Sequence, residues 1–85
     1  MLLEIVVPSG VVWKGEAEQV RIPSANGEMG VLPGHTPLMA ALKSGFVVVD
    51  TRDGNTLGFA VKRGLATVAS AHIYVVVESA DQETV

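Results

Sequence analysis

The chain has 85 residues, of which 48% are hydrophobic, and it carries a formal net charge of −3 at pH 7. This length fits a single domain, residues 1–85, and the apolar content is sufficient for a packed core. Basic residues are few and scattered, so the sequence predicts no nucleic-acid surface and favours protein partners. Because cysteine is absent, disulfides, catalytic thiolates and cysteine-ligated zinc sites are excluded.

The N-terminal residues do not resemble a secretory leader. Residues 1–7 are apolar, but they lack a cationic start and include Glu4, which makes them a poor signal peptide. No apolar run approaches the roughly 20 residues that a membrane-spanning helix requires. We therefore expect no direct membrane insertion, and any membrane association would be through a partner.

Short β-rich runs alternate with turn signals along the chain. Apolar residues recur at every second position in residues 3–7, 20–22 and 57–61, as in strands with one buried face. Asp53-Gly54 predicts a hairpin turn between two such runs, and residues 70–72 predict another. Closely spaced strands of this kind are typical of an all-β sandwich or barrel.

Residues 26–38 are dense in residues with special backbone preferences, with three glycines and two prolines. Asn26-Gly27 is the pair typical of a type I′ turn, in which both residues take positive φ. Pro33-Gly34 fits the centre of a type II turn, because proline sets φ at the second position and glycine accepts positive φ at the third. Gly30, inside the short strand between these bends, predicts a bulge or the close approach of another backbone.

This segment resembles a known family. The run from Gly27 to Leu38, with the spacing G-x-x-G-x-x-P-G-H-x-P, is similar to the glycine-rich loop of the epsilon subunit of F-type rotary ATP synthases. The strand at 3–8 and the Trp13-Lys14-Gly15 step also match, so the resemblance covers the whole chain. It implies an all-β fold, an antiparallel β-sandwich of two packed sheets with about ten short strands.

The resemblance implies a non-catalytic rotor subunit of the central stalk, without a cofactor. Such a subunit links the gamma shaft to the c ring and supports the coupling of ion transport to ATP synthesis. It would be peripheral, on the cytoplasmic face of a bacterial plasma membrane or at the equivalent place in an organelle. Family members continue into a two-helix hairpin to which inhibition is attributed. Those helices would lie beyond Val85, so we expect this chain to couple without inhibiting.

The family's contact positions can be transferred to this sequence by the matching motif. The residues expected at the c ring are Gly27, Glu28, Met29, Gly30 and Val31. The residues expected at the gamma shaft are Val7, His35, Met39 and Ala40. The residues expected to shape the turns are Asn26, Pro33 and Gly34.

Residues 36–45 carry conflicting signals. Thr36 is a good N-cap, Pro37 suits the first helical position and Gly45 follows the end, so local preferences favour a short helix. A helix of two turns has little intrinsic stability, and tertiary pairing can override propensity. The resemblance makes this segment a strand, which would leave Met39 on an outer face, available for docking.

Other interpretations of single residues stay open. An acid at a turn, such as Glu28, is usually only solvated. His35 is more often a hydrogen-bonded loop histidine than a ligand, and Trp13 is more often core than a partner's anchor. The rival functions are a small metal-binding or enzymatic domain that uses His35 and His72, for which no triad or metal motif is evident, and an unrelated β-sandwich adaptor.

Overall fold

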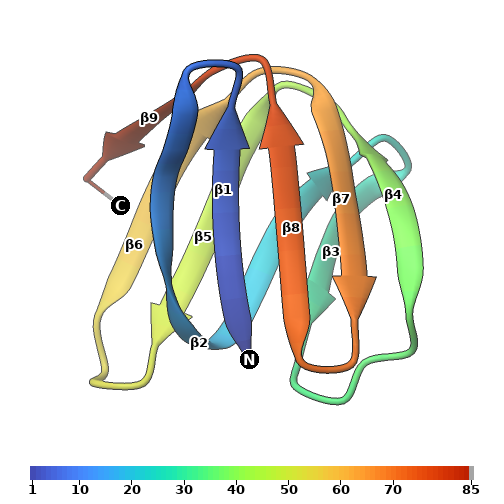
Figure 1. Cartoon of the computed structure of the whole chain (residues 1–85), viewed down its shortest axis with the longest axis vertical. Coiled ribbons are helices and arrows are strands. Elements are labelled where there is room, and N and C mark those ends of the chain that lie inside the picture. Colours follow the sequence, from blue (N-terminus) through green and yellow to red (C-terminus); the bar gives the residue numbers. More distant parts are fainter. Residues whose placement is uncertain (85) are drawn as a thin grey trace.

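The computed structural model describes residues 1–84, and these contain strands but no helix. None of the described segments is therefore a helix able to cross a membrane. The strands in chain order are β1 (Leu2–Val7), β2 (Gly10–Ser24), β3 (Gly27–Val31), β4 (Leu38–Leu42), β5 (Gly45–Thr51), β6 (Thr56–Val61), β7 (Gly64–Ala69), β8 (His72–Val77) and β9 (Ala80–Glu83). They fold into two layers around one apolar core, so the expected β-sandwich is confirmed (Figure 1).

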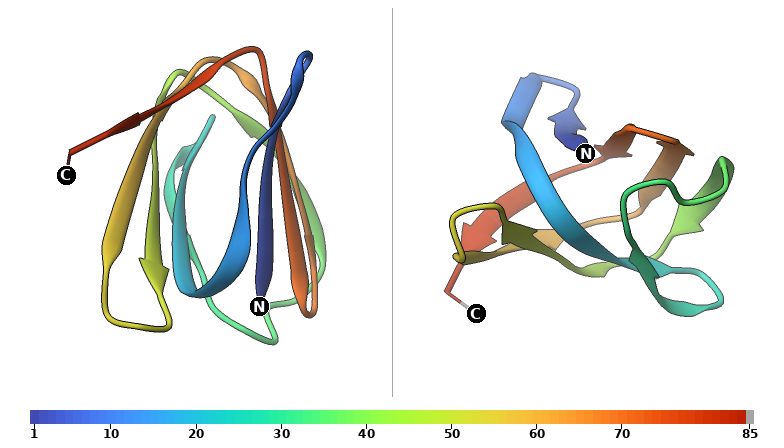
Figure 2. Two further views of the ribbon diagram at one scale, coloured as in Figure 1. Left: turned by 60° about the vertical axis from the view of Figure 1, so that its left-hand side comes forward. Right: turned by 90° about the horizontal axis from the view of Figure 1, so that it is seen from below.

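One strand joins the two layers. Strand β2 has 15 residues; its first half pairs with β1 and its second half pairs with β3 and β5. The hydrogen-bonded order is β1-β8-β7-β4-β2-β5-β6-β9, with β3 paired to β2 and a further ladder between β1 and β2. Strands β1, β8, β7 and β4 form one layer, and the second half of β2 with β3, β5, β6 and β9 forms the other (Figure 2).

Three details of the sheet differ from the expectation. There are nine strands among the described residues, and β2 is long rather than short. Strands β1 and β8 pair in parallel, whereas the other pairings within residues 1–84 are antiparallel. A period-2 pattern tells which residues share a face, but it carries no information about the direction of a partner strand.

Strand β4 confirms that residues 36–45 contain a strand rather than a helix, but it spans only Leu38–Leu42. It pairs with β7 over its whole length, from Leu38 opposite Val68 to Leu42 opposite Gly64. Leu42 is buried, and Leu38 packs against the core from the same face. The helix favoured by local signals does not form, because a two-turn helix cannot match the hydrogen bonds and burial that this pairing supplies.

The core is formed by the inward rows of both layers. Its largest fully buried side chains are Leu3, Ile5, Val20, Ile22, Val31, Val47, Val49, Phe59, Ile73 and Val75. Trp13 is half-buried and packs against this core, with its ring 6.2 Å from that of Phe59. Its indole also covers Gly15, where a Cβ would lie 2.8 Å from the ring. The core interpretation of Trp13 is therefore confirmed.

Of the two turns predicted in residues 26–38, the first is wrong and the second is correct. Gly27 takes a positive φ of 124°, but no described non-glycine residue does, so the type I′ turn at Asn26 is wrong. Ser24 pairs with Gly27, and the Ser24 Oγ accepts a hydrogen bond from the Asn26 amide at 3.1 Å, which centres the bend on Ala25 and Asn26.

The type II turn is confirmed. The His35 amide donates to the Leu32 carbonyl at 3.1 Å, and Gly34 has a φ of 82°. The Gly34 amide donates to the Ser70 carbonyl at 3.1 Å, which ties this bend to the turn between β7 and β8. Pro33 and Gly34 therefore have the structural roles that the sequence predicts for them.

Gly64 lies where β7 begins beside the end of β8, and it provides a test of this packing. A Cβ on Gly64 would lie 2.0 Å from the Val76 carbonyl oxygen and 2.7 Å from the Val77 Cα. We expect Gly64→Ala to lower the free energy of unfolding by about 3 kcal/mol or more, because backbone rather than a flexible side chain must move. Denaturant unfolding measures this loss.

Gly30→Ala is the matched control for this variant. Its Cβ would meet only the Gln19 Nε2 at 3.4 Å. We expect a change within about 0.5 kcal/mol, as for an ordinary surface substitution. Equal unfolding midpoints for the two variants would contradict the close approach at Gly64.

Candidate docking surfaces

The glycine-rich ribbon, defined as residues 25–37, presents alternate side chains of β3 to solvent and to the core. Glu28 and Gly30 are exposed. Met29 packs against the core, and Val31 is fully buried. The register between β2 and β3 is continuous, so the bulge predicted at Gly30 is absent from this described ladder. A partner at the ribbon would therefore meet Glu28, while Val31 anchors the strand from inside.

His35 follows the second bend of the ribbon. Its Nδ1 lies 2.7 Å from the Thr36 carbonyl oxygen, to which a protonated ring nitrogen donates. His35 is thus a hydrogen-bonded loop histidine. His72 lies elsewhere, on β8, with its ring stacked on Tyr74. Within residues 1–84, no group of three or more histidine or acidic side chains is placed to hold a metal ion.

The residues expected at the gamma shaft do not form one cluster. Val7 ends β1 and packs partly against the core. His35 follows Gly34, whose amide bonds to Ser70 in the β7–β8 turn, beside the start of β1 and so at the other end of that strand from Val7. Met39 is 68% exposed, whereas its neighbour Ala40 packs against the core. Of these four residues, Met39 is the exposed one, and the other three are partly buried.

Met39 belongs to a larger surface that the sequence only hinted at. The outer side of the layer β1-β8-β7-β4 exposes 51% of Val76, 40% of Tyr74 and 38% of Leu65. Strand pairing sets these residues in two adjacent rows. One row is Val6, Val76, Leu65 and Ala41, and the other is Glu4, Tyr74, Thr67 and Met39. We call this surface the apolar face.

A signal for the apolar face was present in the sequence. Residues 73–77 read Ile-Tyr-Val-Val-Val, which is apolar at every position rather than at alternate ones. Such a run indicates a strand covered on both faces. The apolar face is exposed in the isolated chain, and contiguous exposed apolar surface usually marks an interaction site.

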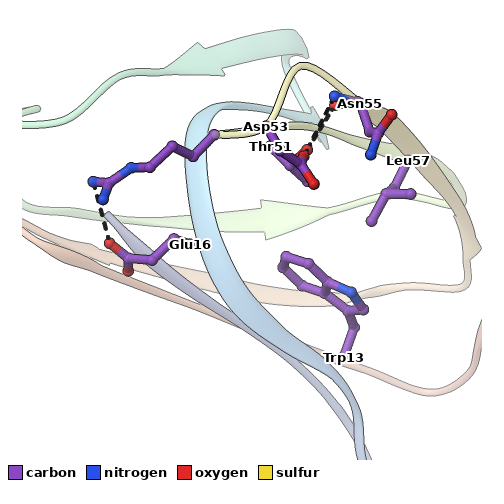
Figure 3. Close-up of a pocket in the computed structure, with 7 residues that line it drawn as sticks. Trp13, Glu16, Thr51, Asp53, Asn55 and Leu57 are labelled. Carbon is purple, nitrogen blue, oxygen red and sulfur yellow. Dashed lines mark hydrogen bonds and ion pairs between the residues drawn. The ribbon is translucent and has the colours of Figure 1, made fainter.

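A separate open hollow, of about 480 Å³, lies between β2 and the β5–β6 hairpin (Figure 3). Trp13 and Leu57 supply its apolar wall. Thr51 Oγ1 donates to the Asp53 carboxylate, and this hydrogen bond lowers the pKa of Asp53. The Thr51 hydroxyl also accepts from the Asn55 amide at 3.1 Å. Thr51, Asp53 and Asn55 are thus engaged in closing the hairpin turn, while Arg52 pairs with Glu16 at 3.8 Å.

Known proteins resemble this chain over nearly its whole length. The epsilon chain of the ATP synthase of Sulfurovum sp. is 36% identical over 80 residues, which cover 94% of this chain and 62% of that relative. The epsilon chain of Micrococcus luteus is 40% identical over 78 residues, covering 92% and 86%. The chain thus spans about three fifths of the length of some relatives, the Sulfurovum protein among them.

The fold is also similar to that of a solved chain. A cryo-EM structure of Euglena gracilis mitochondrial ATP synthase, containing OSCP, F1 and the c-ring, holds a chain that matches with a TM-score of 0.90 at 24% identity. The match covers 96% of this chain and 52% of that one. Residues 1–83 match the family described as ATP synthase, Delta/Epsilon chain, beta-sandwich domain. The chain therefore belongs to the delta/epsilon family of ATP synthase subunits, through its β-sandwich domain.

Proposed function

We propose that this chain serves in the central stalk of an F-type ATP synthase, where it links the gamma shaft to the c ring. The observation that carries the proposal is the apolar face, on which Met39, Leu65, Tyr74 and Val76 are exposed on adjacent strands, an arrangement that favours a partner. Membership of the delta/epsilon family supports an F-type ATP synthase as the complex. The chain would be peripheral, on the cytoplasmic face of a bacterial plasma membrane.

In this role the chain makes and breaks no covalent bond. It is a rigid body with two contacts, one to the shaft and one to the ring. Each contact can be weak alone, because joining them through one body raises the effective concentration of the second. The continuous hydrogen-bonded ladder through both layers supports such rigidity.

We assign the gamma shaft to the apolar face. Met39 lies on this face with Leu65, Tyr74 and Val76. Val7 and His35 lie at the two ends of the same layer and would contact the shaft only at its margins. Ala40 packs against the core, so its part is to support β4 from inside.

We assign the c ring to the tip of the ribbon, residues Gly27, Glu28, Met29 and Gly30. Glu28 is exposed, and within residues 1–84 it forms no ion pair with a cationic side chain. A carboxylate free of internal partners can accept hydrogen bonds from polar groups of a neighbouring subunit. Val31 anchors this tip to the core rather than contacting the ring.

Met39→Asp tests the shaft contact. We expect this variant to bind the gamma subunit of the same synthase about tenfold or more weakly, because docking would desolvate an unpaired carboxylate. Titration calorimetry measures the Kd. Phe46→Asp is the matched control, since Phe46 is 52% exposed on β5 in the other layer. A greater loss of binding for Phe46→Asp than for Met39→Asp would place the shaft on the other layer.

Glu28→Ala tests the ring contact. We expect the free energy of unfolding to stay within about 0.5 kcal/mol, because Glu28 is exposed. In reconstituted synthase vesicles, ATP-driven ion pumping should fall relative to ATP hydrolysis. Glu83→Ala, which removes an exposed carboxylate from β9, should leave this ratio unchanged. Unaltered pumping in the Glu28→Ala enzyme would show that the ring contact lies elsewhere.

A further inference from the structure

The apolar face contains one charged cluster, formed by Glu4, Lys14 and His72. Glu4 pairs with Lys14 of β2 on one side and with Tyr74 of β8 on the other. It therefore lies in the same row as Met39, at the other end of that row. The Glu4 Oε1 is 3.3 Å from the Lys14 Nζ and 3.8 Å from the His72 Nε2.

The Glu4 carboxylate is unusually covered for a charge on an outer face. Its side chain is 17% exposed, whereas the side chain of Lys14 is 57% exposed. Both nitrogens approach the same oxygen, and both distances exceed those of a strong charge-assisted hydrogen bond, about 2.7–2.9 Å. The His72 Nε2 is buried and has no hydrogen-bond partner. The free chain thus leaves this carboxylate only partly compensated.

A partner that covers the apolar face must remove the remaining water from Glu4. Desolvating a carboxylate is costly unless a cation or donor takes the place of water. A wholly apolar partner surface would therefore bind poorly at this point. A partner with a donor opposite Glu4 would bind in one register, because a shift along the row would leave both groups unpaired.

We propose that Glu4 determines the specificity of the apolar face by selecting a partner segment that is apolar except for one cationic side chain opposite this carboxylate. The inference rests on the proposed function, in which the face holds the gamma shaft, and it adds the chemistry of that partner. Lys14 screens Glu4 in the free chain. Its exposed ammonium moves into water when the partner's donor arrives.

Glu4→Leu gives the decisive test, with the gamma subunit of the same synthase as the probe. A donor opposite Glu4 makes this variant bind about tenfold or more weakly, because the donor loses its acceptor. An apolar surface opposite Glu4 would make the same variant bind more tightly, since the cost of desolvating the carboxylate is removed. Tighter or unchanged binding overturns the proposal.

Three further variants sharpen this result. Glu4→Gln keeps the shape of the side chain and should also bind about tenfold more weakly, which keeps the test valid if Glu4→Leu does not fold. Lys14→Met should bind the gamma subunit more tightly, because the partner's donor then meets a Glu4 carboxylate that Lys14 no longer screens. Weaker binding by Lys14→Met would identify Lys14 itself as the contact and overturn the proposal. Glu18→Gln, which removes a carboxylate paired with Arg52 outside the cluster, should change the Kd by less than about twofold.

The outcomes separate this inference from the function on which it rests. If the wild-type chain does not bind gamma, or if Met39→Asp has no effect, the apolar face is not the shaft contact and both proposals fail. If wild-type binding is present and sensitive to Met39, but Glu4→Leu binds more tightly, only the role of Glu4 is overturned.

Discussion

The double pairing of β2 is the constraint on which the rest of the structure depends. One strand completes the ladder with β1 in the first layer and with β3 and β5 in the second. Because side chains alternate along a strand, this pairing decides for every neighbour which residues enter the core and which face outward. The pairing of β2 also holds the ribbon in a fixed position relative to the apolar face, because the ribbon continues directly from β2. In the proposed function, one rigid body could then hold two partners.

The same pairing explains why an 85-residue domain exposes apolar surface. A domain of this size buries only a moderate share of its surface, so its stability depends on dense inward rows of aliphatic residues. Residues 73–77 of β8 place apolar side chains in the core on one side. On the other side, within the described chain, Tyr74 stays 40% exposed and Val76 stays 51% exposed. Exposing these side chains lowers the solubility of the free chain. Burying them under a partner is favourable, because apolar surface is then removed from water.

Charged side chains can make the apolar face selective for one partner and one orientation, which apolar contacts alone do not do. Apolar burial rewards any complementary surface, so it does not fix orientation by itself. Glu4, set among Tyr74, His72 and Lys14, is a charged group of this face that we expect docking to desolvate. Glu28 on the ribbon differs from Glu4 because it is exposed to water. It can therefore contact polar groups of a partner at little desolvation cost.

The sequence by itself determined the features that single residues enforce. Proline and glycine fix the turn at Pro33-Gly34, alternation marks the strands, and the glycine spacing identifies the family. Tertiary structure decided what depends on partners distant in the chain. It made Leu38–Leu42 a strand against its helical signals, moved the first bend one residue from Asn26-Gly27, set β1 parallel to β8, and brought Glu4 beside His72. Local preferences are worth only fractions of a kcal/mol to about 1 kcal/mol per residue, so pairing and burial between distant segments overrule them.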